Sequence, residues 1–165
     1  MPITPFHFGP GFLIHAAAPR RVGFIAFAAA NCITDVETTY NILAGRYPYH
    51  AFLHTFLGAA VSAALTVALF LFMHRLARRT SLPNWFGWQE LTVFPVTVGA
   101  VLGSYSHVVL DGIMHADMRP LAPWSDDNPF LHLVSLDALH LGCVGAAVVG
   151  GLLWLMFSRR KPRHM

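Results

Sequence analysis

The chain has 165 residues, of which 55% are hydrophobic and only 12% are charged. A soluble domain usually carries about 25% charged residues, so this composition argues against an ordinary soluble enzyme. The 11 Lys and Arg residues stand in short clusters between apolar runs. Such a pattern excludes disorder and a basic nucleic-acid-binding face, so no nucleic acid partner is expected. The composition predicts an integral membrane protein with one domain over residues 1–165.

Histidine is unusually common in this chain. There are 10 histidines against 8 Asp and Glu residues together. The two cysteines, Cys32 and Cys143, lie in separate apolar runs and form neither a disulfide framework nor a zinc knuckle. The excess of histidine is therefore the first indication of function.

The N-terminal region allows three interpretations. Residues 11–18 and 22–34 are apolar, but a Pro-Arg-Arg break at 19–21 separates them. The alternatives are one span that begins near Val22, a hairpin of two short helices that turns at the break, and a cleaved signal peptide. The signal peptide is the least favoured, because its leader would be long and largely apolar.

Three later runs are each long enough to cross a bilayer, which takes about 20 residues in a helix. They are residues 51–73, 91–110 and 138–157, and their interiors are rich in Gly and Ala. Small residues let helices approach each other closely in lipid. The sequence therefore predicts an all-α membrane bundle of about four spans, in which the N-terminal span is either one helix or a hairpin of short helices.

The basic clusters indicate the orientation of this bundle. With four spans, residues 20–21, 75–79 and 159–163 fall on the same side, and an excess of Lys and Arg marks the cytoplasmic side. The loops 35–50 and 112–136 are then expected to face outward.

Histidines and carboxylates from separate segments are predicted to gather at the outer ends of the spans. The candidates are Asp35, Glu37, His50, His54, His107, Asp111, His115, Asp137 and His140. Four segments that deliver such groups to one depth give the strongest functional signal in the sequence.

The spacing of these residues favours a metal site. His50 and His54, His107 and Asp111, and Asp111 and His115 are each four residues apart. Residues at this spacing share a helix face, with Cβ atoms about 5–6 Å apart. Imidazole and carboxylate ligands without thiolate suit a divalent ion, Zn²⁺ first, with Mn²⁺ or Fe²⁺ as alternatives. A catalytic ion would keep a position for water, whose pKa it lowers to about 7.

Each group also has a simpler interpretation when it is taken alone. The His50 and His54 pair fits packing or hydrogen bonding, and Asp35 with Glu37 fits a solvated helix end. Asp111 is harder to explain, because an ionised Asp at the centre of a span costs roughly 2.5–3.5 kcal/mol on insertion scales. An interfacial, solvated Asp111 is the alternative to a ligand.

The order of these motifs resembles a known family. Thr-Pro-Phe-His-Phe-Gly at 4–9, Asp-Val-Glu at 35–37, His50-x-x-x-His54 and Ser106-His107-x-x-x-Asp111 occur in the order found in membrane-bound metal-dependent hydrolases. That family is also described as LexA-binding inner-membrane hydrolases. The resemblance covers roughly residues 7–115, and it implies a membrane-embedded, metal-dependent hydrolase.

This family is in turn distantly similar to the zinc-dependent phospholipase C enzymes. Carried over by position, the resemblance implies a metal-ligand set of His7, Asp35, His54, His107 and Asp111. Asp35, Glu37, His50 and His115 are the expected catalytic residues. The soluble enzymes also use a His-x-x-x-Glu pair, which this sequence lacks.

His7 links the resemblance to the topology. A single span that starts near Val22 inside the cell would leave His7 on the cytoplasmic side, whereas a hairpin returns it to the outer side. We therefore favour the hairpin. At 1.5 Å per residue its helices reach only about 12–20 Å, so either the membrane would be thinned or the site would lie below the membrane surface.

These expectations converge on a metal-dependent hydrolase, a phosphoesterase, in the inner membrane of a bacterial or archaeal cell. Its substrate would be a membrane lipid or a lipid-linked phosphoester, cleaved by metal-activated water at the outer face. A covalent lipid phosphatase is disfavoured, since its Pro-Ser-Gly-His element and the Arg before its His are absent. The alternative is a non-enzymatic metal- or haem-binding four-helix membrane protein or a transporter. The sequence predicts no oligomeric state.

Overall fold

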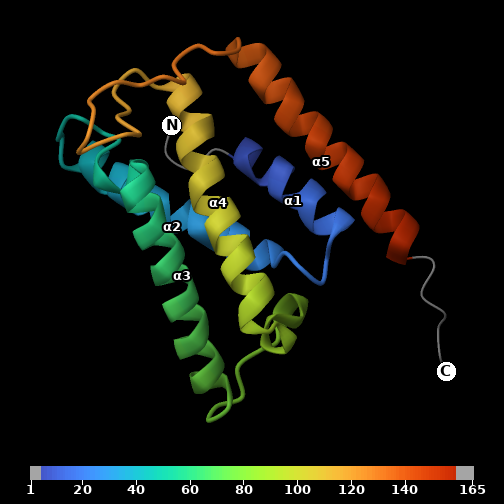
Figure 1. Ribbon diagram of the computed structural model, residues 1–165. Helices are drawn as coiled ribbons and strands as arrows, with labels where there is room; N and C mark the ends of the chain where they lie inside the picture. The colour runs from blue at the N-terminus through green and yellow to red at the C-terminus, as the bar shows by residue number, and fades with distance from the viewer. Residues whose placement is uncertain (1–4, 159–165) are drawn as a thin grey trace.

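The computed structural model describes residues 5–158, apart from the side chains at positions 85 and 86, and this part of the chain is all-helical. The α-helices are α1 (Phe8–Ala17), α2 (Phe24–Leu43), α3 (Phe56–Ala77), α4 (Val93–Met114) and α5 (Leu136–Ser158). The 3₁₀-helices are η1 (Pro5–His7), η2 (Phe52–His54) and η3 (Trp85–Glu90). The arrangement in Figure 1 confirms the predicted all-α bundle.

Three of these helices, α3, α4 and α5, are long and apolar enough to cross a membrane. They correspond to the three long apolar runs, so the chain is a membrane protein with about three full spans rather than four. α2 has 20 residues but is not among them, because from Asn31 onward it carries several polar side chains, such as Asp35 and Thr38, which are buried.

The N-terminal region forms the predicted hairpin. Across the turn between α1 and α2, His15 Nδ1 lies 2.7 Å from the carbonyl oxygen of Val22. The Gly23 N–H then donates to the carbonyl oxygen of Pro95, 2.7 Å away, which holds the turn against the first turn of α4. His7 therefore lies at the opposite end of the bundle from this turn, level with the end of α4.

One part of the topological prediction is wrong. Residues 35–50 were expected to form an outward loop, but α2 continues to Leu43. Asp35 and Glu37 therefore project from the interior of a helix and not from its end. The helix can continue because its buried polar residues find partners in the packed bundle rather than in water.

α2 and α4 run side by side in the same direction, and glycines set their close approach. A Cβ on Gly99 would meet the carbonyl oxygen of Gly23, and one on Gly103 would lie 3.0 Å from Cα of Phe27. The Gly99-x-x-x-Gly103 pattern is the small-residue contact that brings membrane helices together. Four residues further along both helices, the same alignment of α2 and α4 pairs Asn31 with His107.

α5 lies at the edge of the bundle and packs mainly on α1 (Figure 1). Gly9 of α1 abuts the backbone carbonyl of Cys143, and Gly150 of α5 abuts the backbone of Leu13 at 2.9 Å. Only 11% of the most apolar 18-residue stretch of α5 is buried within the protein, so most of this helix is available to lipid.

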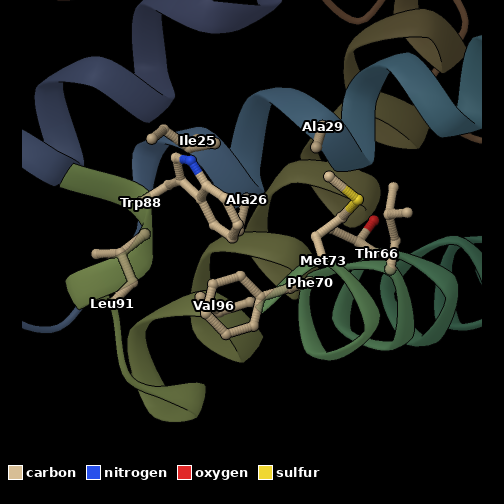
Figure 2. Close-up of a pocket in the computed structure, with 10 residues that line it drawn as sticks. Ile25, Ala26, Ala29, Thr66, Phe70, Met73, Trp88, Leu91 and Val96 are labelled. Carbon is tan, nitrogen blue, oxygen red and sulfur yellow. The ribbon is translucent and has the colours of Figure 1, made fainter. Parts of the chain in front are cut away.

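An apolar cavity of about 190 Å³ lies between α2, α3, α4 and η3. Figure 2 shows its lining, which includes Ile25, Ala29, Phe70, Trp88 and Val96. These residues come from the beginnings of α2 and α4, the second half of α3 and η3, so the cavity lies toward the hairpin turn. Residues 20–21 and 75–79 belong to this same end, whereas the third basic cluster, residues 159–163, lies outside the described residues.

Candidate metal centre

Four buried side chains from three segments meet near the ends of α2 and α4. They are Asp35 of α2, His54 of η2, and His107 and Asp111 of α4, and one donor atom of each lies within 4.8 Å of those of the others. Their exposed fractions are between 0% and 4%. The predicted gathering of His and Asp from separate segments is present in the structure.

The distances between these donors match those around a tetrahedral metal ion. Zinc–ligand bonds of about 2.0–2.1 Å would place two ligands of one tetrahedral ion roughly 3.4 Å apart. His107 Nε2 lies 3.3 Å from Asp35 Oδ1, 3.2 Å from Asp111 Oδ2 and 3.3 Å from His54 Nε2. His54 Nε2 lies 3.7 Å from Asp35 Oδ1 and 3.6 Å from Asp111 Oδ2. The group therefore has the chemistry and the spacing to hold a divalent ion, although it does not identify the metal.

Asn31 fixes the orientation of the His107 ring. The Asn31 amide donates to the carbonyl oxygen of Phe27 at 2.9 Å, which turns its Oδ1 toward His107 Nδ1, also 2.9 Å away. His107 Nδ1–H then donates to that oxygen and leaves the Nε2 lone pair directed at the donor group. Metal-ligating histidines almost always have such a partner on the other ring nitrogen.

The segment that carries His54 is held by three contacts. Glu37 Oε2 accepts a hydrogen bond from the N–H of Leu53 at 2.6 Å, and the Thr55 hydroxyl caps α3 by accepting from Gly58 N at 2.9 Å. Gly58 abuts the carbonyl oxygen of Phe52, where a Cβ would not fit. This packing folds η2 back over the start of α3 and turns His54 inward.

Glu37 is therefore placed differently from the other candidate residues. Its carboxylate supports the backbone of η2, and it is not a member of the described donor groups. The expected catalytic role of Glu37 gains no geometric support, and its observed contact is a positioning one.

A second donor group shares Asp111 with the first. His50, Asp111 and His115 each offer an atom within 4.8 Å of the others. The Nε2 atoms of His50 and His115 each lie 4.0 Å from an oxygen of Asp111, and the two imidazole rings stack with centroids 4.3 Å apart. The side chain of His115 is 26% exposed, against 5% for Asp111.

The helical spacing that suggested these pairs is only partly correct. His107 and Asp111 do share a face of α4, but His50 lies in the loop before η2 and His115 follows the last residue of α4. His115 has φ −118° and ψ 124°, an extended conformation. Loop folding, and not an α-helical face, therefore brings His50 and His115 to the site.

His7 reaches the same centre from η1. Its Nε2 lies 3.2 Å from Asp111 Oδ1, and its ring meets the His107 ring edge-on with centroids 4.7 Å apart. Apart from this contact with each other, the buried His7 Nε2 and Asp111 Oδ1 have no hydrogen-bond partner, and the buried His7 Nδ1 has none either. Buried polar atoms rarely go unpaired in native proteins, so these three atoms are consistent with a bound cation.

Asp117 is a site residue that the sequence analysis missed. Its Oδ1 accepts from His50 Nδ1 at 2.8 Å, and its Oδ2 accepts from the N–H groups of Tyr49 and His50 at 3.0 and 3.2 Å. Its position two residues beyond His115 was the only available signal. Asn31 was missed as well, and its position one helical turn before Asp35 was the corresponding signal.

His50 and His54, which precede α3 and lie outside the spans, have pKa values that shift in opposite directions. Burial lowers the pKa of His50, and the neighbouring His54 lowers it further. Burial would also lower the pKa of His54, but hydrogen bonds with Asp111 and Asp35 outweigh it and raise that pKa. These surroundings therefore favour the neutral form of His50 and the protonated form of His54.

Two predicted polar residues of α5 do not join the cluster. His140 packs its ring on Phe6 with centroids 4.6 Å apart, and Asp137 is exposed in the first turn of the helix. The donor groups among residues 5–158 thus come from α2, α4 and the loops around them, and His7 adds η1.

Comparisons with family models, with curated proteins and with solved structures found no match to this chain. The resemblance to membrane-bound metal-dependent hydrolases therefore stays an expectation from the motif order.

Proposed function

We propose that this protein is a metal-dependent hydrolase that cleaves a phosphoester of a membrane lipid or lipid-linked substrate. The observation that carries the proposal is the set of five donor–donor distances of 3.2–3.7 Å among Asp35, His54, His107 and Asp111. Zn²⁺ is the preferred ion for this donor set, with Mn²⁺ or Fe²⁺ as alternatives.

In this proposal the residues of the site have three roles: metal binding, orientation of the ligands and proton transfer. Asp35, His54, His107 and Asp111 hold the ion, which when bound supplies Lewis acidity and an activated water. Asn31 and Asp117 keep His107 and His50 in the tautomers whose Nε2 faces the centre. His50 and His115 stand beside the donor group, where an imidazole can carry a proton to or from the reacting atoms.

The position of the centre supports a lipid or lipid-linked substrate. It is at one end of α3 and α4, helices that can cross the membrane, so a lipid head group would reach it without leaving the bilayer surface. The basic turn at residues 20–21 and the cluster at 75–79 belong to the other end. By the positive-inside rule the site would face the outside of the inner membrane of a bacterial or archaeal cell.

Haem ligation fits this geometry poorly. Two axial histidines of a haem iron would have their Nε2 atoms roughly 4 Å apart with the macrocycle between them. Here the Nε2 atoms of His54 and His107 are 3.3 Å apart and two carboxylates contact them.

The test is metal content and hydrolysis measured on the same preparations. The purified chain in detergent would be analysed for bound metal and assayed with a panel of phospholipids and polyprenyl phosphates. Asp111→Asn keeps the size of the side chain but removes its charge, so we expect it to lose both the metal and the activity. His140→Ala, outside the donor groups, should lose neither. Hydrolysis by metal-free protein would contradict the proposal, as would wild-type protein that binds metal but cleaves nothing in the panel.

A further inference from the structure

The apolar cavity at the hairpin end extends from the core to the outside of the bundle. Thr66 on α3 and Val96 on α4 are only 3% and 0% exposed, so they form its buried inner wall. Ile25 on α2 and Leu69 on α3 also line it, and they are 36% and 49% exposed. The cavity is therefore accessible from the surroundings of the helices. Because α3 and α4 can cross a membrane, those surroundings are the acyl chains of the bilayer.

The lining of this cavity is unsuited to water. Among the described residues that line it, only Thr66 and Trp88 carry a hydrogen-bonding side-chain group. The Thr66 hydroxyl donates to the carbonyl oxygen of Ser62 at 2.8 Å, and Trp88 Nε1–H donates to that of Pro83 at 3.0 Å. A buried water typically needs two to four polar partners, and these two groups have already donated their protons within the protein. The cavity is therefore suited to an apolar occupant.

Its size fits part of a hydrocarbon chain. An apolar cavity of about 150 Å³ in a protein core stays dry and is large enough to bind benzene. This cavity has about 190 Å³ and is lined by aliphatic and aromatic side chains. If the space stayed unfilled, the atoms of its lining would lose dispersion contacts on one side. An acyl chain restores those contacts.

η3 forms one wall of the cavity and is held in place by hydrogen bonds. His74 Nε2 on α3 lies 2.9 Å from the carbonyl oxygen of Gln89, and Gln89 Nε2 donates to the carbonyl oxygen of Leu82 at 2.9 Å. The Trp88 ring stands edge-on to Phe70, with centroids 6.5 Å apart (Figure 2). These contacts tie η3 to the second half of α3, so the wall is formed by the fold itself.

The charge at this end selects the head group of the lipid. The exposed arginines of the hairpin turn and of the end of α3 are Arg20, Arg21, Arg75, Arg78 and Arg79. Among the described residues at this end the acidic one is Glu90 of η3. Clusters of Lys and Arg beside a membrane attract anionic lipids. A lipid whose chain enters the cavity would place its head group among these arginines.

We propose that the cavity between α2, α3, α4 and η3 is a binding site for one acyl chain of an anionic phospholipid, whose phosphate lies among the arginines of the hairpin end. This site is at the opposite end of the helices from the His and Asp cluster, and it does not depend on the proposed hydrolase function.

Fluorescence quenching by brominated acyl chains tests whether a chain enters the cavity. Trp85→Phe, Trp124→Phe and Trp154→Phe together leave Trp88 as the only tryptophan of the full chain. This protein would be placed in nanodiscs of phosphatidylcholine that contain increasing amounts of phosphatidylglycerol with brominated chains. We expect the quenching of Trp88 to saturate while the brominated lipid is still a minor component. A chain that keeps only Trp154, which is 50% exposed on α5, should be quenched in proportion to the brominated fraction.

Two comparisons separate the chain from the head group. Brominated phosphatidylcholine has no net charge for the arginines to attract, so it should need about a tenfold higher fraction to half-saturate the quenching of Trp88. Ala29→Phe in the Trp88-only chain puts a large side chain into the cavity and should reduce the quenching to the proportional level. Ala68→Phe, at an exposed position of α3 that does not line this cavity, is the matched control and should leave it saturable.

The outcomes decide each part of the inference. Proportional quenching of Trp88 in the chain with an unaltered cavity would overturn it, and so would saturable quenching in Ala29→Phe. Loss of saturation in Ala68→Phe would also contradict it, because that change lies outside the cavity. Equal half-saturation by the two lipids would show a chain in the cavity but contradict the selection of an anionic head group.

Discussion

The two ends of α2, α3 and α4 show how one set of helices can enclose opposite environments. At one end the helices surround buried His and Asp side chains, and at the other they surround an apolar cavity with Thr66 as its only side-chain hydroxyl. The close glycine contacts between α2 and α4 begin at the apolar end, at Gly23 and Gly99, and lead toward the polar end. The contacts near the apolar end thus set the alignment of α2 and α4. That alignment brings the His and Asp side chains together at the polar end.

The two ends should differ completely in their access from outside the cell. In a chain with Cys32→Ser and Cys143→Ala, Trp124→Cys should react fully with a membrane-impermeant thiol reagent added to intact cells. Thr80→Cys should react only after the cells are opened, because the basic residues 75–79 lie beside it. Labelling of Thr80→Cys in intact cells would mean that the orientation is reversed and that the metal centre faces the cytoplasm.

Gly103→Leu tests whether the alignment of α2 and α4 sets the site. A Cβ there would meet the carbonyl oxygen of Phe27 and lie 3.0 Å from its Cα, one turn before the Asn31–His107 contact. Overpacking of this kind costs about 1–3 kcal/mol, and we expect a lower thermal midpoint together with loss of bound metal. Gly142→Leu on α5, where a Cβ meets nothing within 4 Å, is the matched control. Equal metal content in both variants would show that the site does not depend on this contact.

Asn31 gives a smaller and more local test of the polar end. Asn31→Leu removes the acceptor of His107 Nδ1–H and should weaken metal binding by about 10–100-fold in a chelator competition titration. Asn31→Asp restores an acceptor, so it should bind metal more tightly than the Leu variant does. The same affinity in both variants would mean that Asn31 does not orient His107.

A matched threonine pair compares the two ends directly and should give the smallest effect. Thr38 Oγ1 lies 3.4 Å from the ring nitrogens of His54, whereas Thr66 donates to the carbonyl oxygen of Ser62 beside the apolar cavity. Thr38→Val should weaken metal binding by a few-fold, and Thr66→Val should leave it unchanged. A larger loss of metal in Thr66→Val would show that the two ends are coupled.

The sequence predicted much of the site because membrane composition restricts where charged groups can be. His and Asp residues within or beside apolar runs stand out against a background of Ala, Val and Leu, so His54, His107 and Asp111 were identifiable without a structure. Asn31 and Asp117 were not, because an amide in a helix and a carboxylate in a loop are ordinary by themselves. Their roles exist only through their contacts with His107 and His50.

What the sequence determined by itself is the membrane bundle, its long apolar helices and the residue types of a metal site. These follow from local composition and spacing, because lipid permits only helices with few charges. Tertiary structure alone decided that α2 continues past Asp35, that Glu37 turns to the backbone of Leu53, and that Asp111 faces two donor groups. These outcomes depend on which buried polar atoms find partners across helices, and such partners are far apart in the chain.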